Sequence, residues 1–332
     1  YATNNWLIAL GKKIGESSIR EAVQVAMQVL SKEFVCAEGI DELKDSTWLK
    51  FHNCSFDMLG EASRNQEQSD QYFESYMESI HMISEINAAE DLNNGISIKL
   101  SALYSRFDAL HINNVNKFLY PRVKDLIIEA ARKDVAVTID AEEQDRLSLS
   151  LDLIKSLSLD PAIESWPGLG LAVQAYGKRS HSVVDWLDQL SNKRARMNVR
   201  LVKGAYWDYE IKNAQVRGLA GYPVFTNKQL TDLNYLVTAR RLMECCNLDA
   251  SFATHNAHSI AAIMSLNEGS DKKIEFQRLY GMGELLYSAC EASYQHFPET
   301  SIYCPIGRHK ELLPYLVRRL LENGANSSFI NK

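Results

Sequence analysis

The 332-residue chain has only seven prolines and six cysteines, and it has no excess of positive charge. The cysteines show neither a CxxC pair nor the regular spacing of a disulfide framework, so we expect no structural zinc and no bound metal. Cysteines that form neither pattern are typical of proteins in a reducing cytoplasm. The formal net charge of −6 argues against a nucleic-acid-binding surface, which needs concentrated positive charge.

Long apolar stretches are also missing. No run approaches the roughly 18 residues that a membrane span requires, and the first residues lack the charged-then-apolar pattern of a secretion signal. With 46% hydrophobic and 23% charged residues, the composition is that of an ordinary globular protein. The chain starts with Tyr1 instead of methionine, and we expect it to be a piece of a longer polypeptide.

The spacing of apolar residues differs between two parts of the chain. Residues 1–50 carry apolar side chains at helical spacing and are predicted to form a helical arm. In residues 51–332, eight short apolar stretches, most of them with β-branched residues, each precede a longer helix-like segment. The stretches are 55–61, 96–101, 135–142, 169–176, 198–205, 250–256, 274–281 and 301–307. This alternation predicts a parallel sheet, and eight units predict an α/β fold, the (β/α)8 barrel. A doubly wound open sheet is the alternative, but no GxGxxG follows the first stretch.

Polar residues occur at the end of every predicted strand. They are Glu61, Lys99, Asp140, Gln174, Arg200 with Lys203, His255 with Asn256, Gln277 and Tyr303. Strands also end in polar residues simply because they meet solvent. Lys99, Asp140 and Arg200, however, lie between apolar neighbours, which implies partial burial, and a buried charge requires a partner. Because barrel enzymes carry their chemistry at the carboxyl ends of the strands, we expect the active site there.

The last predicted helix contains a second group of polar residues. Tyr315, Arg318 or Arg319, and Glu322 recur at three- and four-residue spacing and share one helical face. The arginines could form a surface ion pair with Glu322, or they could bind the carboxylate of a substrate.

Two further patterns leave alternatives open. His255 and His258 could ligate a metal, although no third ligand is evident, and Thr254, His255 and Asn256 suit a phosphate or a flavin pyrimidine equally well. Tyr206, Tyr303 and Tyr315 could pack in the core or enclose a small apolar ring.

Several stretches, taken together and in order, carry a resemblance to a known family. They are "DMLGEA", "GISIKLSALYSRF", "IDAEEQDRL", "VQAYGKRS", "RLVKGAYWDYEIKNAQ", "GYPVFTNK", "FATHNAHS", "YGMGE" and "LVRRLLENGAN". The chain resembles the proline dehydrogenase domain of bifunctional bacterial flavoenzymes from about residue 5 to its end. The resemblance implies oxidation of L-proline to Δ1-pyrroline-5-carboxylate, with hydride transfer to N5 of a non-covalent FAD. It also implies a membrane quinone as electron acceptor, peripheral association with the inner membrane when reduced, and an aldehyde dehydrogenase domain elsewhere in the polypeptide.

The same resemblance assigns roles to residues. Lys99, Arg318 and Arg319 would hold the proline carboxylate, Asp140 would orient Lys99, and Arg200 would lie near the flavin N5 and N1 edge. The expected wall of the substrate site consists of Leu201, Tyr206, Tyr303 and Tyr315, with Glu61 paired to Arg318 as a gate. The expected cofactor contacts are Ala141, Gln174, Arg200, Val202, Lys203, Gly204, Ala205, Trp207, Thr226, Lys228, Thr254, His255, Asn256, Gln277, Leu279 and Glu322.

Two other functions compete with this one. Lys99 or Lys203 could form a Schiff base with a carbonyl substrate, as in aldolase-type barrels. Alternatively, the arm could bind another domain or subunit while the barrel has no activity.

Overall fold

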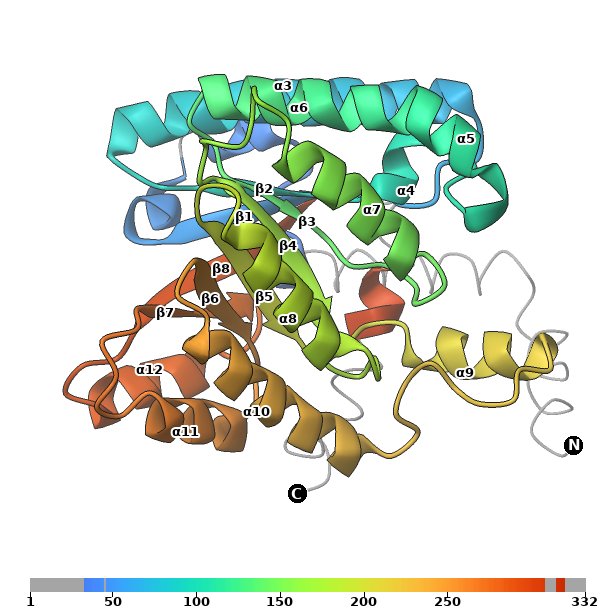
Figure 1. Cartoon of the computed structure of the whole chain (residues 1–332). Coiled ribbons are helices and arrows are strands. Elements are labelled where there is room, and N and C mark those ends of the chain that lie inside the picture. The colour runs from blue at the N-terminus through green and yellow to red at the C-terminus, as the bar shows by residue number, and fades with distance from the viewer. Residues whose placement is uncertain (1–32, 45, 308–314, 320–332) are drawn as a thin grey trace, which may run out of the picture.

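The eight predicted strands all form, and they close into a parallel barrel in sequence order, β1 to β8 (Figure 1). The computed structural model describes residues 33–44, 46–307 and 315–319. The strands are β1 (Asn53–Met58), β2 (Gly95–Ile98), β3 (Val137–Ile139), β4 (Leu169–Gln174), β5 (Met197–Val202), β6 (Leu248–Ala253), β7 (Ile274–Leu279) and β8 (Glu299–Ile306). The predicted (β/α)8 barrel is therefore confirmed.

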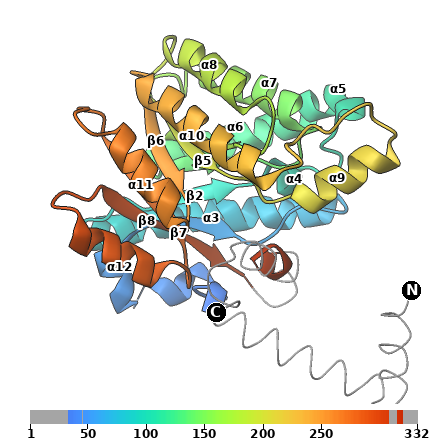
Figure 2. The ribbon, with the colours of Figure 1, turned by 90° about the horizontal axis from the view of Figure 1, so that it is seen from below.

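Helices surround the barrel and cover its outer face (Figure 2). They are α3 (Gln66–Glu90), α4 (Leu100–Leu103), α5 (Ile112–Asn114), α6 (Tyr120–Arg132), α7 (Leu147–Ser158), α8 (Ser180–Ser191), α9 (Trp207–Val216), α10 (Lys228–Glu244), α11 (Ala257–Leu266) and α12 (Glu284–Ser293), with short helical turns at η1 (Ile40–Leu43), η2 (Thr47–Phe51), η3 (Ala109–His111) and η4 (Val115–Leu119). In both views α9 lies away from the barrel wall, beyond the ends of the strands.

The two faces of the strands differ sharply in chemistry. Side chains alternate between faces along a strand, and outward residues such as Phe56, Ile98 and Val199 are fully buried. Many inward residues are polar, and Arg200 on β5 lies beside Ser251 on β6 in the register of the barrel. The packed apolar core is therefore outside the barrel wall, and the inside is left for charged and hydrogen-bonding groups.

The described part of the predicted arm packs directly on the barrel. The Cys36 amide donates to the Pro305 carbonyl at 3.0 Å, and the Gly307 amide donates to the Ala37 carbonyl at 3.1 Å. Leu43 and Leu49 belong to the same hydrophobic core as the strands. The predicted long helix of the arm lies mostly in residues 1–32, outside the described residues, and the boundary between residues 50 and 51 stays a prediction.

Candidate active site

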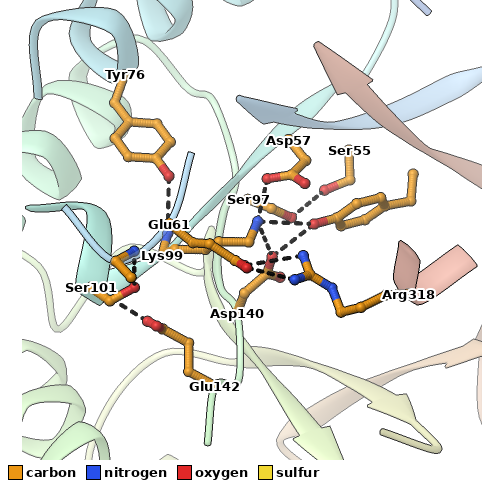
Figure 3. Close-up of polar contacts among 12 residues, drawn as sticks. Ser55, Asp57, Glu61, Tyr76, Ser97, Lys99, Ser101, Asp140, Glu142 and Arg318 are labelled. Atoms are coloured by element: carbon orange, nitrogen blue, oxygen red, sulfur yellow. Dashed lines mark hydrogen bonds and ion pairs between the residues drawn. The ribbon is translucent and has the colours of Figure 1, made fainter. Parts of the chain in front are cut away.

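A buried cluster of charged and phenolic side chains inside the carboxyl end of the barrel joins β1, β2, β3 and β8 (Figure 3). The Lys99 ammonium, after β2, pairs with Asp57 on β1 and lies 3.1 Å from Oδ2 of Asp140, after β3. The Tyr303 hydroxyl on β8 donates to Oδ2 of Asp140 at 2.8 Å. The Lys99 amide in turn donates to the hydroxyl of Tyr76 on α3, 3.1 Å away, which fixes the point where β2 ends.

Arg200 extends the cluster to β5. Its Nη1 donates to Asp140 Oδ1 at 3.0 Å and to Ser97 Oγ at 2.9 Å, while Nη2 donates to Ser55 Oγ at 2.7 Å. The guanidinium also lies over the Tyr303 ring, 5.1 Å from its centre. A cation inside a strand is thus stabilised by a carboxylate, two hydroxyls and an aromatic face, which explains how β5 carries a buried arginine.

The pKa values show which groups carry charge. Burial raises the pKa of Tyr303 well above its usual range, so the phenol keeps its proton and donates. Burial opposes charge on Lys99, but Asp57, Tyr303 and Asp140 outweigh it and raise the lysine pKa further. For the two aspartates the balance differs: burial raises the pKa of Asp57, whereas the attraction of Lys99 and Arg200 overcomes burial and lowers that of Asp140. Asp140 is therefore the firmly ionised partner of both cations.

A second ion pair lies beside this cluster. Arg318 binds Glu61 in a two-pronged contact, Nη1 to Oε1 at 2.5 Å and Nη2 to Oε2 at 3.1 Å. The Tyr206 hydroxyl donates to the same carboxylate at 3.3 Å, and its ring lies 5.2 Å from the Arg318 guanidinium. Burial lowers the pKa of Arg318, but Tyr206, Glu61 and, to a smaller extent, Asp57 outweigh burial and raise it. The predicted pairing of Glu61 with the first arginine is present in the structure.

The neighbouring residues of that helix form a separate contact. In residues 315–319, Tyr315 is buried with Leu59, Met282 and Leu316, and the Arg319 guanidinium lies 5.2 Å from its ring centre. Tyr315 thus packs in a small core and also supports an arginine. Glu322 lies outside the described residues.

The loop after β5 approaches the barrel wall closely. The Gln174 side chain on β4 donates to the Glu142 carbonyl at 2.8 Å, and its carbonyl oxygen accepts from the Ala205 amide at 3.4 Å. Gly204, the residue before Ala205, has a φ of +135°. A Cβ added to Gly204 would lie only 2.5 Å from the Tyr176 ring. Only glycine fits without strain at this position.

Replacing Gly204 by alanine is expected to lower the free energy of unfolding by about 1–3 kcal/mol, because it adds an unfavourable φ to a steric clash. Urea denaturation measures this change. Gly218→Ala is the matched control, since Gly218 also has a positive φ, +60°, but no atom lies within 4 Å of its added Cβ. Equal losses in the two variants would show that the contact with Tyr176 is unimportant.

Two predicted cofactor lysines share one carboxylate. Lys203 and Lys228 contact the two oxygens of Asp232 on α10 at 2.5 and 2.7 Å, which leaves the group with a net positive charge. Trp207 is held nearby, since its indole donates to the Phe225 carbonyl at 2.9 Å. Thr226 is exposed and Val202 half-buried at the edge of this region.

The ends of β6 and β7 are tied together by hydrogen bonds. The Leu279 amide donates to His255 Nε2 at 2.9 Å, and the Thr254 amide donates to the Gln277 carbonyl at 3.2 Å. Asn256 caps α11 by accepting from the Ser259 amide at 2.9 Å. His255 and Asn256 therefore have structural partners already.

Ala141 and Leu201 lie at different depths in the barrel wall. Ala141 follows Asp140 and is half-buried. Leu201 is fully buried in the hydrophobic core, and strand alternation puts it on the face of β5 opposite Arg200, so the structure does not bring it to the predicted substrate wall.

The prediction missed three members of the central cluster, Asp57, Ser55 and Ser97. Asp57 could have been found by the rule that singled out Lys99, because it is a charge between the apolar residues Phe56 and Met58. The serines carry no such signal, since their role depends on the register that brings them to Arg200.

The cluster disfavours a Schiff-base lysine. Such a lysine must lose its proton to attack a carbonyl, and the pKa of Lys99 is shifted in the opposite direction by its carboxylate partners. Lys203, the other candidate, is paired with the Asp232 carboxylate.

Within the described residues, the structure contains no helix with the length and apolarity needed to cross a membrane.

Comparison with known proteins identifies the family. The family model "Proline dehydrogenase" matches residues 39–332. "Bifunctional protein PutA" of Escherichia coli K12 is 45% identical over 96% of this chain, but the chain spans only 25% of that protein. "Proline dehydrogenase 2" of Bacillus subtilis strain 168 is 25% identical over 99% of this chain and 91% of its own length.

Among solved structures, a mutant of proline utilization A (PutA) from Bradyrhizobium japonicum superposes with a TM-score of 0.84 at 45% identity, covering 97% of this chain and 33% of that one. PutA from Bdellovibrio bacteriovorus, inactivated by N-propargylglycine, gives the same TM-score at 31% identity, with 93% and 34% covered. A model that matches most of the chain, together with relatives that cover nearly all of it, shows that this chain belongs to the proline dehydrogenase family.

Proposed function

We propose that this chain oxidises L-proline to Δ1-pyrroline-5-carboxylate with a non-covalent FAD. The observation that carries the proposal is that Lys99, Asp140, Arg200 and Tyr303, from four parts of the sequence, meet inside the carboxyl end of a barrel of the proline dehydrogenase family. This is the end at which barrel enzymes place their chemistry.

The residues expected to hold FAD suit such a group. Arg200 Nε is a buried donor and Gln277 Oε1 a buried acceptor, and within the described residues neither has a hydrogen-bond partner. Lys203 and Lys228, with a net positive charge around Asp232, suit a diphosphate. Gly204 lets the backbone approach a flat ring closely. FAD bound there would supply N5 as acceptor for the hydride on the proline ring carbon next to nitrogen.

The cations divide into two groups. Lys99 and Arg200 are paired with Asp57 and Asp140, and Arg318 is paired with Glu61. We assign the proline carboxylate to Arg318 and Arg319, whose forked guanidinium groups suit a carboxylate, with Lys99 donating a directed hydrogen bond. Glu61 holds Arg318 in place, and Tyr206, Tyr303 and Tyr315 would enclose the pyrrolidine ring.

Arg200 and Asp140 act electrostatically in this proposal. The Arg200 guanidinium, fixed by three side chains, would stabilise negative charge that reduction places on the ring system. Asp140 contacts both cations and keeps them oriented. In the cell, we propose, the electrons pass to a quinone, the protein contacts the inner membrane peripherally from the cytoplasmic side, and an aldehyde dehydrogenase domain belongs to the same polypeptide.

Product formation tests the proposed reaction. Purified protein loaded with FAD should convert L-proline to a product that o-aminobenzaldehyde traps as its coloured adduct, with a soluble quinone as acceptor. The same mixture with NAD in place of quinone should give no sustained product. Turnover with NAD alone, or no product with any quinone, would contradict the proposal.

A further inference from the structure

A carboxylate inside the barrel has no part in the proposed reaction. Glu275 lies on the inner face of β7, two residues before Gln277. Its Oε2 accepts from Ser251 Oγ on β6 at 3.0 Å, and its Oε1 accepts from Ser301 Oγ on β8. Burial raises the pKa of Glu275, and the hydrogen bonds from Ser301 and Ser251 and the charge of Arg200 offset this rise only in part. Both oxygens of the carboxylate are therefore occupied by donors from the neighbouring strands.

Each serine also accepts a hydrogen bond from a side-chain amide. Gln277 Nε2 donates to Ser301 Oγ at 2.9 Å, and Asn198 Nδ2 donates to Ser251 Oγ at 2.9 Å. The single hydroxyl proton of each serine is donated to a carboxylate oxygen of Glu275. Each serine can then only accept from its amide, which requires the NH2 group of Gln277 to face Ser301.

The carbonyl oxygen of Gln277 must therefore face away from Ser301. Gln277 is 4% exposed, and Oε1 has no hydrogen-bond partner in the described part of the chain. A buried carbonyl oxygen is costly to leave unpaired, so this atom is an acceptor for a group that binds there. Were the amide reversed, the same position would present a donor and would select a different ligand.

We propose that Glu275, acting through Ser301, is a positioning residue that fixes the Gln277 amide so that its carbonyl accepts a hydrogen bond from an N–H or O–H group of the flavin. The inference rests on the proposed function, because the flavin is the ligand. Two flavin groups have this chemistry, the imide N–H of the ring and the hydroxyls of the ribityl chain.

The two serines provide matched variants. Ser301→Ala removes the link to Gln277, whereas Ser251→Ala removes an equally buried serine from the same carboxylate without touching that link. Ser301→Ala should weaken FAD binding by roughly tenfold and shift the visible absorption bands of the bound flavin, since the amide can then rotate. Ser251→Ala should leave both properties unchanged. The measurements are fluorescence titration of FAD and the spectrum of the bound flavin, neither of which depends on turnover.

A second pair of variants tests whether Ser301 acts through Gln277. In a Gln277→Leu background, Ser301→Ala should cause no additional loss of FAD affinity, because the amide to be positioned is gone. An additional loss equal to that in the unaltered protein would overturn the inference. If Ser301→Ala does not fold, Ser301→Cys, with its weaker hydrogen-bonding thiol, should show a smaller change in the same direction.

Cofactor analogues identify the donor. FAD methylated at the imide nitrogen and FAD lacking ribityl hydroxyls each remove one candidate, and one of them should bind the unaltered protein and Ser301→Ala equally. A difference that persists with both analogues would overturn the assignment. Equal losses in Ser301→Ala and Ser251→Ala would overturn this inference alone, whereas failure of the unaltered protein to bind FAD would overturn the proposed function as well.

Discussion

Lys99→Met is expected to lower kcat/KM for proline by roughly a thousandfold and to lower the free energy of unfolding by about 3–5 kcal/mol. The ammonium contacts both Asp57 and Asp140, and all three side chains are largely buried. Methionine fills the space but leaves two neighbouring carboxylates with only Arg200 to balance them. Steady-state kinetics and urea denaturation measure the two effects.

A compensating variant separates stability from activity. Adding Asp57→Asn to Lys99→Met restores the charge balance, with Arg200 against Asp140, and should recover most of the lost stability. Activity should stay low, because the directed donor to the substrate is still absent. Recovery of activity in the double variant would show that Lys99 matters only for the fold.

Arg319→Met should raise KM for proline by roughly one hundredfold or more while FAD stays bound. The expected size is that of losing one charged partner from a buried, hydrogen-bonded pair. Arg319 lies over the Tyr315 ring, which limits the directions its guanidinium can take. Arg240→Met, which removes an arginine that is 72% exposed on α10, is the control and should leave KM unchanged. An unaltered KM in Arg319→Met would remove this arginine from the carboxylate site.

Much of the fold followed from local patterns. The strands are short and largely apolar, most contain β-branched residues, and helical stretches alternate with them, so the sequence predicts their number and order. The buried charges were equally visible, since Lys99, Asp140 and Arg200 interrupt apolar runs. Closing the barrel brings the ends of the strands together, which is why residues far apart in sequence could be expected to meet.

The hydrogen-bond partners of Arg200 could not be predicted, because they depend on the register between strands. Ser55 and Ser97 bind Arg200 only because β1, β2 and β5 are staggered as they are. Asp57 has a different explanation: the rule for strand ends selects Glu61, which follows β1, and passes over a charge inside the strand. Strand alternation, applied to β5, would also have separated Leu201 from Arg200. The short helices between β2 and α6 gave no pattern of their own.

The visible spectrum of the purified protein, with and without L-proline in the absence of oxygen, tests the central claim most directly. The account predicts a yellow protein whose flavin band bleaches when proline is added, without NAD, and returns when a quinone follows. A folded protein that stays colourless in excess FAD, or a yellow one that proline does not bleach, would contradict it.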